Sequence, residues 1–279
     1  HEATIKGGGH EATIKGGGAG AELRIKAVGA LRSLLLPNTP PTNDTSVAWG
    51  EINIELLANL PAGVLRLALT VLAEMGMYAD MEVLAELVAK AQPTWLWCQY
   101  YREFAAVTVH VDSSRRAAWG QENICSVLNL SERVVAMEPV VAVGHIKALQ
   151  PLVRAIAVVK ATPQTDGAAP GDALLVDLES DILLLLGRVM RMAGGKLRDD
   201  VKGGCLPQLV NSARLNPHCG ATYCCLGHFY HCRPADSSKA VRCYQKAVEL
   251  DPQNEDAGNA LTQLMLCDPA SGPVEALRM

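Results

Sequence analysis

Cysteine and histidine are concentrated between residues 218 and 243, and these side chains are the ones in this chain best suited to chemistry. They are Cys219, Cys224, Cys225, Cys232 and Cys243, interleaved with His218, His228 and His231. A structural zinc ion takes four such ligands in a tetrahedron. However, no Cys-x-x-Cys pair occurs, and the adjacent Cys224 and Cys225 point to different faces of a helix. Cys224, His228 and His231 share one face at i, i+4 and i+7, so a three-ligand site is conceivable, but the spacing favours packing.

The other cysteine positions do not indicate a disulfide framework. Cys225, Cys232 and Cys243 fall where a helical array needs a small apolar side chain, and cysteine behaves as one. The total of nine is odd. The remaining cysteines are dispersed, at Cys98, Cys125, Cys205 and Cys267. This usage predicts a reducing compartment.

Catalytic motifs are absent from the sequence. It contains no phosphate-binding glycine loop followed by Lys and Ser or Thr, no G-x-S-x-G and no H-E-x-x-H. Asp199 and Asp200 are paired carboxylates, but Lys196, Arg198 and Lys202 around them indicate a solvated loop. We therefore predict a protein that is not an enzyme, with no catalytic residue, no cofactor and no small-molecule substrate.

The densest aromatic cluster is predicted to be structural. It comprises Trp95, Trp97, Tyr100, Tyr101 and Phe104. Its positions favour a helix–helix interface, and the alternative is an anchor for a partner protein.

The elements that position these residues are predicted by one tetratricopeptide repeat between residues 220 and 252. Its signature residues are Tyr223, Leu226, Gly227, Tyr230, Ala240, Tyr244, Ala247 and Pro252. Two antiparallel helices pack closely only where small residues separate the backbones, and large residues must fill the gaps between them. Proline ends the second helix because it cannot donate the next backbone hydrogen bond.

A single repeat cannot bury its own apolar face, so neighbouring repeats are expected. Leu186, Gly187 and Met190 repeat the first-helix spacing, and Ser212 with Pro217 repeats the end of the second helix. These residues predict a second unit immediately upstream.

A third, degenerate unit is suggested further upstream by Leu72, Gly76, Tyr78 and Pro93, although Leu69 stands where Gly or Ala belongs. The fold class expected overall is an all-α, right-handed α-solenoid of helical hairpins, degenerate in its N-terminal half.

The candidate binding face of such an array is its concave side, lined by first-helix positions two, five, nine and twelve. In the repeat at 220–252 these are Ala221, Cys224, His228 and His231. A groove that captures a terminal carboxylate needs Lys, Arg or Asn at such positions, and this repeat has none. The sequence thus argues against an adaptor for chaperone tails.

Composition agrees with a helical array and excludes other classes. The 279 residues are 49% hydrophobic but only 4% aromatic, with a net charge of −4 and a pI of about 6.0. This balance gives no electrostatic reason to bind nucleic acid or membranes directly. No apolar run reaches the roughly 18 residues needed to span a bilayer. The longest, at 182–192, carries Arg188 and Arg191 and is predicted to be a buried helix.

The chain is predicted to have five parts. They are a flexible, duplicated Gly-rich segment at 1–18, a helical, degenerate repeat-like region at 19–161, a linker at 162–171, tetratricopeptide repeats at 172–268 and a tail at 269–279. Helices are expected at 22–36, 51–60, 63–75, 81–91, 94–107, 121–129, 131–136 and 140–159, with a loop at 37–46. Residues 113–117 are expected to form a short loop or, alternatively, to open the next helix, and an isolated strand is the alternative at 107–111.

The first part is the nonapeptide HEATIKGGG repeated twice. It is interpreted as an artefact, a low-complexity duplication or a fragment edge, and it lacks the features of a secretory signal. His1 and His10 with Glu2 and Glu11 would hold a metal only weakly, because glycine tethers do not preorganise them.

Residues 181–258 resemble a known family, the tetratricopeptide scaffold subunit of the superkiller complex (thespin). The stretches that carry the resemblance are SARLNP at 212–217, CLGHFY at 225–230, RCYQKAVELD at 242–251 and EDAG at 255–258. The enlarged, charged loop at 194–204 is also similar to the family's.

The resemblance implies a cytoplasmic scaffold, with a nuclear pool as a further expectation. In that family the scaffold holds an RNA helicase and β-propeller subunits, and feeds RNA to the 3′-to-5′ exosome during messenger decay. The scaffold would contact RNA only indirectly, through these partners. The alternatives are a general tetratricopeptide adaptor for chaperone, transport or other multiprotein machinery, and a metal or thiol enzyme using His228. The chain is also expected to be a fragment whose C-terminal face is left uncovered.

Overall fold

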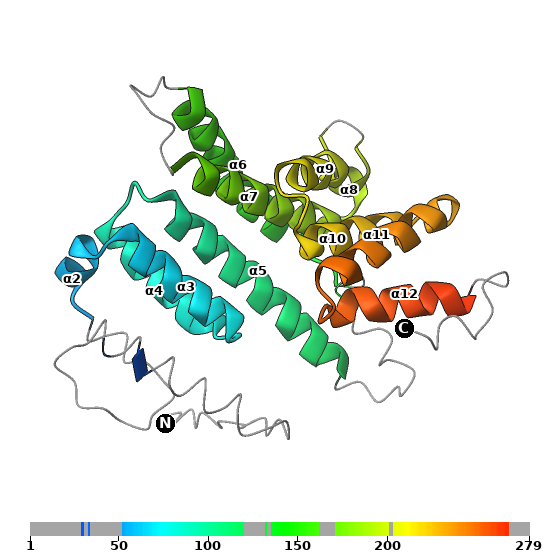
Figure 1. Cartoon of the computed structure of the whole chain (residues 1–279), viewed down its shortest axis with the longest axis horizontal. Helices are drawn as coiled ribbons and strands as arrows, with labels where there is room; N and C mark the ends of the chain where they lie inside the picture. The colour runs from blue at the N-terminus through cyan, green and yellow to red at the C-terminus, as the bar shows by residue number, and fades with distance from the viewer. Residues whose placement is uncertain are drawn as a thin grey trace, which may run out of the picture.

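The structure is a computed structural model that describes residues 29, 30, 33, 52–119, 132, 135–161, 171–200 and 203–267. Within these ranges all regular secondary structure is helical, with no strand, and the expected all-α solenoid is confirmed (Figure 1). The elements are α2 (Ile54–Asn59), α3 (Ala62–Glu74), α4 (Tyr78–Ala91), α5 (Leu96–Trp119), α6 (Pro139–Ala161), α7 (Gly171–Ala193), α8 (Gly195–Asp199), α9 (Cys205–Leu215), α10 (Gly220–His231), η4 (Pro234–Asp236), α11 (Ser237–Leu250) and α12 (Glu255–Cys267).

Several sequence predictions fall outside the described residues. These are the duplicated segment 1–18, the loop 37–46, the helix 121–129, residues 162–170 of the linker and the tail 269–279. Of the predicted helix at 22–36, the structure describes only residues 29, 30 and 33, which are helical.

Helices α10 and α11 form the hairpin that the repeat signature predicts. Ala240, Tyr244 and Ala247 recur along α11 at helical spacing, and all three are fully buried against α10. The helix ends at Leu250, just before Pro252, as expected. The apolar stripe therefore determines which face of α11 packs against α10, and Pro252 determines where the helix ends.

Glycine at the eighth repeat position lets the two helices of each hairpin approach. A Cβ atom on Gly227 would lie 2.5 Å from ring carbons of Tyr244. A Cβ on Gly187 would lie 2.6 Å from the Leu209 side chain in the preceding unit. The two glycines thus perform the same steric task in α10 and α7, and the predicted upstream unit is a hairpin of α7 and α9.

The two hairpins stack through small and polar groups. Ser180 Oγ on α7 lies 3.2 Å from Ser212 Oγ on α9, and Ser212 Oγ lies 3.1 Å from Thr222 Oγ1 on α10. These three buried hydroxyls satisfy one another at the point where three helices meet. The enlarged loop after α7 contains α8, and it begins at Gly194 and Gly195, which have positive φ angles of 69° and 53°.

Helix α12 packs on the end of the stack of hairpins. Its buried residues Ala257, Ala260 and Leu261 pack on the hairpin of α10 and α11. Polar residues Asn259, Thr262 and Gln263 occupy less buried positions, although Leu266 is 55% exposed. The expectation of an uncovered C-terminal face concerns the chain beyond α12 and stays a prediction.

The N-terminal helices pack on both sides of the long helix α5 (Figure 1). Helices α2, α3 and α4 lie on one side, and α6 and α7 form an antiparallel pair on the other. The predicted aromatic cluster lies at this junction. Trp97 stacks on Tyr101 with ring centroids 5.9 Å apart, and Tyr101 Oη lies 2.8 Å from Thr70 Oγ1 on α3. The cluster is thus a helix–helix interface.

The third, degenerate unit is not built as its residues predicted. Gly76 has a φ angle of 67° and lies in the turn between α3 and α4, whereas Tyr78 begins α4. The role of Gly76 is to terminate α3, and just beyond it Met77 N–H donates to Leu72 O. A helical hairpin is present here, but Gly76 is a turn glycine and does not separate two packed helices.

Helix α5 also differs from the prediction. It runs unbroken from Leu96 to Trp119, so the loop at 113–117 and the conceivable strand at 107–111 are both wrong. Val107 and Val111 are buried on one side of the helix, so packing overrides the preference of valine for strands. Of the helix predicted at 131–136, the structure describes residue 132, which lies in a 3-10 turn, and residues 135 and 136, which have no regular structure before Pro139 starts α6.

By length and composition, α6 is apolar enough to cross a membrane, and it is the one such helix in the described part of the chain. Its best window has a mean hydropathy of 1.3, and 28% of that window is buried. Lys147 and Arg154 interrupt its apolar run in the sequence. One side, including Ile146 and Leu149, packs in the core with α5 and α7.

Candidate functional site: the concave groove

A pocket of about 270 Å³ lies where α5, α7, α10 and the start of α12 meet. It is lined by Tyr100, Phe104, Glu132, Asp181, Leu184, Leu185, Arg188, Ala221, Cys224, Cys225, His228, Asn254 and Asp256. Positions two, five and nine of both repeats are in this set. The pocket is therefore the concave groove of the array, where solenoid proteins present their binding surface.

The structure brings three of the four predicted concave residues together. Ala221, Cys224 and His228 line the pocket, and His228 is almost completely buried. His231 does not line it, because its ring packs against Tyr244 with Nδ1 3.3 Å from the tyrosine Oη. The three-ligand set of Cys224, His228 and His231 is thus not assembled.

The centre of the groove is a carboxylate held by two guanidinium groups. Glu132 Oε1 accepts from Arg188 Nε at 2.7 Å, and Oε2 accepts from Arg188 Nη2 at 2.6 Å. Arg191 Nη2 also donates to Oε1, at 2.9 Å. The arrangement is bidentate from Arg188, which adds both strength and direction to the ion pair.

The groove also binds the backbone of residue 132. Its N–H donates to Asp256 Oδ2 at 3.1 Å, and its carbonyl oxygen accepts from Arg191 Nη2 at 3.2 Å. A few residues later, Met137 N–H donates to Met192 O at 3.0 Å. The side chain of Met137 is 3% exposed, so the segment is held by polar and apolar contacts together.

The arginines determine the protonation of Glu132. Burial alone would raise the pKa of this carboxyl group, but Arg188 and Arg191 more than offset that cost and hold the pKa well below its usual range. Glu132 therefore stays ionised at physiological pH, and its charge is matched inside the protein.

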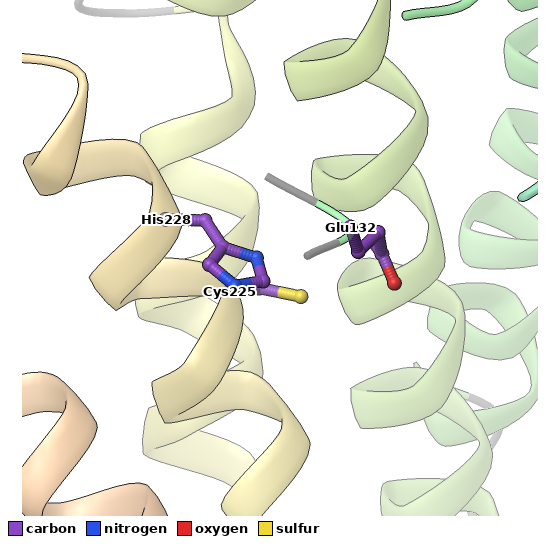
Figure 2. Close-up of side chains that lie close together, drawn as sticks. All are labelled: Glu132, Cys225 and His228. Carbon is purple, nitrogen blue, oxygen red and sulfur yellow. The ribbon is translucent and has the colours of Figure 1, made fainter. Parts of the chain in front are cut away.

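Two overlapping groups of side chains in the groove could hold a metal ion by proximity alone. One is Glu132 with Cys225 and His228, and the other is Cys224 with His228 and Asp256. Figure 2 shows the Cys225 and His228 side chains, both from α10, close to Glu132. Ligand atoms within each group lie within 4.8 Å of one another.

The chemistry of these donors does not suit a cation. Both oxygens of Glu132 already accept from arginine, and the guanidinium charges repel a positive ion. Burial raises the pKa of the Cys225 thiol to about 12 and also raises that of Cys224, so neither thiol is ionised as a nucleophile must be. The groove is therefore suited to hydrogen bonding.

The remaining cysteines are structural or solvent-facing. No disulfide joins the seven cysteines whose side chains are described. Cys205 is buried and Cys243 is partly buried, which agrees with packing, but Cys232 follows the last residue of α10 and is exposed. The prediction of a framework position for Cys232 is therefore wrong. Asp200 is exposed, as a solvated loop requires.

Sequence reasoning missed the two arginines, although a signal for them existed. With Leu186 and Gly187 as positions seven and eight, Arg188 and Arg191 are positions nine and twelve of the upstream repeat. The rule that selected His228 therefore also selects Arg188. No local signal marks Glu132 or Asp256, because their role depends on contacts with distant parts of the chain.

Asp181, on α7 at position two of the upstream repeat, makes the groove less stable at neutral pH. Burial and the neighbouring Asp177 raise its pKa to about 6, so ionising it opposes folding once the pH exceeds its unfolded pKa. Asp181→Asn is expected to raise the melting temperature by roughly 2 to 6 °C at pH 8 and to have no effect at pH 4. Thermal melts at both pH values measure this, with the exposed Glu86→Gln as control. An equal gain at both pH values would contradict the assignment.

A segment of the chain is similar to a known tetratricopeptide protein. Over 81 residues it is 37% identical to Superkiller complex protein 3 of Mus musculus, covering 29% of this chain and 5% of that protein. It is 35% identical over 79 residues to Superkiller complex protein 3 of Homo sapiens, covering 28% of this chain and 5% of that protein. It is 35% identical over 69 residues to Tetratricopeptide repeat protein 37 of Xenopus laevis, covering 25% of this chain and 4% of that protein.

The chain therefore spans about one twentieth of the length of these relatives. No family model matches the chain. The comparisons confirm that a segment of the chain resembles the superkiller scaffold subunit. Together with the helical hairpins, they indicate a scaffold of the tetratricopeptide type.

Proposed function

We propose that this chain is a protein–protein interaction scaffold of the superkiller complex, which assists messenger decay by the cytoplasmic 3′-to-5′ exosome. The observation that carries the proposal is the pair of stacked hairpins, α7 with α9 and α10 with α11, in a chain with a segment similar to Superkiller complex protein 3. A stack of this kind presents a long concave surface, and binding is the activity such surfaces perform.

The partners proposed are an RNA helicase and β-propeller subunits, with RNA met only through them. In the groove both thiols have raised pKa values and Glu132 is paired with arginines, which supports a role in binding. The near-neutral balance of charge gives no electrostatic reason for direct nucleic-acid binding. The location proposed is the cytoplasm, with a nuclear pool.

Affinity purification of the full chain, followed by mass spectrometry of bound proteins, tests the proposal. An RNA helicase and a β-propeller protein are expected in near-stoichiometric amounts. The matched control is a chain carrying Gly227→Trp, which disrupts the α10–α11 hairpin and is expected to lose both partners. Recovery of chaperones alone, with no RNA-decay component, would reverse the proposal.

The second candidate is an adaptor for another multiprotein complex, such as chaperone machinery. Arg188 and Arg191 favour it, since cations at positions nine and twelve can bind a carboxylate. Their pairing with Glu132 weighs against it, because a terminal carboxylate would have to displace an internal one. Capture of an acidic C-terminal peptide by the purified chain would favour the adaptor.

A further inference from the structure

The end of the concave groove at Asp181 differs from the end that holds Glu132. Asp181 and Arg188 lie seven residues apart on α7, about 10 Å along the helix axis. Tyr100 and Phe104 of α5 line the same pocket, with ring centroids 5.8 Å apart. Burial and the charge of Asp181 both raise the pKa of the Tyr100 hydroxyl group, so the carboxylate lies near these rings. This end of the groove therefore combines an acidic group with aromatic surface.

Asp181 is the one carboxylate of the pocket that lacks a polar partner among the described residues. The lining contains three carboxylates. Glu132 is paired with arginines, and Asp256 Oδ2 lies 3.1 Å from the backbone nitrogen of residue 132 and 3.4 Å from His228 Nε2. In the described part of the chain, Asp181 makes no hydrogen bond and no ion pair. Two of the three acidic groups are thus satisfied within the protein.

A nearby cation of the protein does not balance the charge of Asp181. The Arg66 guanidinium group on α3 acts to lower the pKa of Asp181, but its central carbon lies 4.6 Å from the centre of the Trp97 ring. Burial and the neighbouring Asp177 outweigh it, and the pKa stays raised at about 6. A carboxylate that lowers stability in a binding groove is typical of a site that a ligand completes. A positively charged ligand would supply the missing partner.

We propose that this end of the groove binds an arginine side chain of a partner protein, which pairs with Asp181 and stacks on the half-buried ring of Phe104. The proposal rests on the scaffold function and names the chemistry by which the partner is recognised. A guanidinium group suits the site because it donates two hydrogen bonds to a carboxylate and stacks on aromatic rings. It is also more weakly hydrated than the ammonium group of lysine, so it enters a half-buried pocket at lower cost.

The size and charge of the pocket agree with one arginine side chain. Its volume of about 270 Å³ lies below the roughly 300 to 1,000 Å³ of small-molecule sites. Arg188 does not exclude a second guanidinium group, because its own charge is matched by bidentate pairing with Glu132 at the other end of the groove.

The test uses N-acetyl-L-arginine amide as the probe and the full chain at pH 8. NMR titration is expected to give a Kd on the order of 1 mM, with the largest amide shifts on α5 and α7. The matched probe is the citrulline derivative, in which a neutral urea group of the same shape replaces the guanidinium group. It is expected to bind at least tenfold more weakly, because it cannot form the charge-assisted pair.

Variants of the chain separate the site from general charge effects. Asp181→Asn is expected to weaken binding of the arginine probe at least tenfold while raising the melting temperature at pH 8, so the loss cannot arise from unfolding. Phe104→Leu is expected to weaken it by roughly 3- to 10-fold. Glu86→Gln, at an exposed glutamate of α4, is expected to leave it unchanged. Equal binding of the two probes, or wild-type affinity in Asp181→Asn, would overturn the proposal.

The partner is tested by the affinity purification described above. The Asp181→Asn chain is expected to recover at least one of the two partners in an amount lowered fivefold or more, and Glu86→Gln in wild-type amounts. Undiminished recovery of both by Asp181→Asn would overturn the proposal and leave the scaffold function intact. Binding of the arginine probe without recovery of either partner would instead refute the scaffold function. Self-association of the wild-type chain that Asp181→Asn abolishes, measured by sedimentation velocity, would assign the arginine to a second copy and overturn the partner assignment.

Discussion

A chain carrying Gly227→Trp is expected to lose its cooperative thermal transition, with a destabilisation of at least about 3 kcal/mol. Even one added carbon on Gly227 would lie 2.5 Å from the ring of Tyr244, which is fully buried and has no room to turn. An indole at that position forces α10 and α11 apart. Gly227→Ala is expected to cost less, about 1 to 3 kcal/mol. Circular dichroism melts measure both effects.

The matched control is Gly258→Ala on α12, where an added Cβ meets nothing within 4 Å. Removing a glycine from a helix interior is expected to stabilise the chain by roughly 0.5 to 1 kcal/mol. If Gly227→Trp and Gly258→Ala melted at the wild-type temperature alike, the hairpin packing described for α10 and α11 would be wrong.

Glu132→Ala is expected to destabilise the chain by about 3 to 5 kcal/mol at pH 7, because it leaves the buried guanidinium group of Arg191 and the partly buried one of Arg188 without their carboxylate. The effect has a defined pH dependence. The folded-state pKa of Glu132 is lowered, so its stabilisation is present above the unfolded pKa of about 4.5 and is lost as the pH falls toward the folded value. Urea unfolding at pH 7 and pH 3 measures the difference between variant and wild type.

The control for this prediction is Glu138→Ala, on the same segment but exposed, which is expected to change stability by less than about 0.5 kcal/mol. A difference between Glu132→Ala and wild type that is the same at pH 3 and pH 7 would show that the loss arises from packing and not from the ionised carboxylate.

The hairpins could be predicted from the sequence because their determinants are local. Gly227, Tyr244, Ala247 and Pro252 lie within one repeat, and the steric rule that relates them acts over two adjacent helices. The structure agrees with each of these positions, including the end of α11 before Pro252.

The predictions failed where packing overrides local preference. The valines of α5 favour a strand by propensity, yet their burial against neighbouring helices keeps the helix unbroken to Trp119. Gly76 was misjudged because a turn glycine and a packing glycine look the same in a sequence. Only the backbone angle or the facing helix distinguishes them.

The groove could be predicted only in part. The repeat positions identify Ala221, Cys224 and His228, and the same positions in α7 identify Arg188. The carboxylate that pairs with these arginines in the groove could not be predicted, because 56 residues separate Glu132 from Arg188. A single sequence contains no rule that pairs two charges across that distance.

The hydrogen bond between Glu132 N–H and Asp256 joins residues 124 positions apart. Repeat arrays usually fold from local nuclei and fray from their ends, because each unit contacts only its neighbours. Here a contact of very high sequence separation links the region before α6 to the last described helix, and closing so large a loop carries an entropy cost that slows folding. Loss of α12 is therefore expected to weaken the contacts of residue 132, and the described helices are expected to unfold together instead of repeat by repeat.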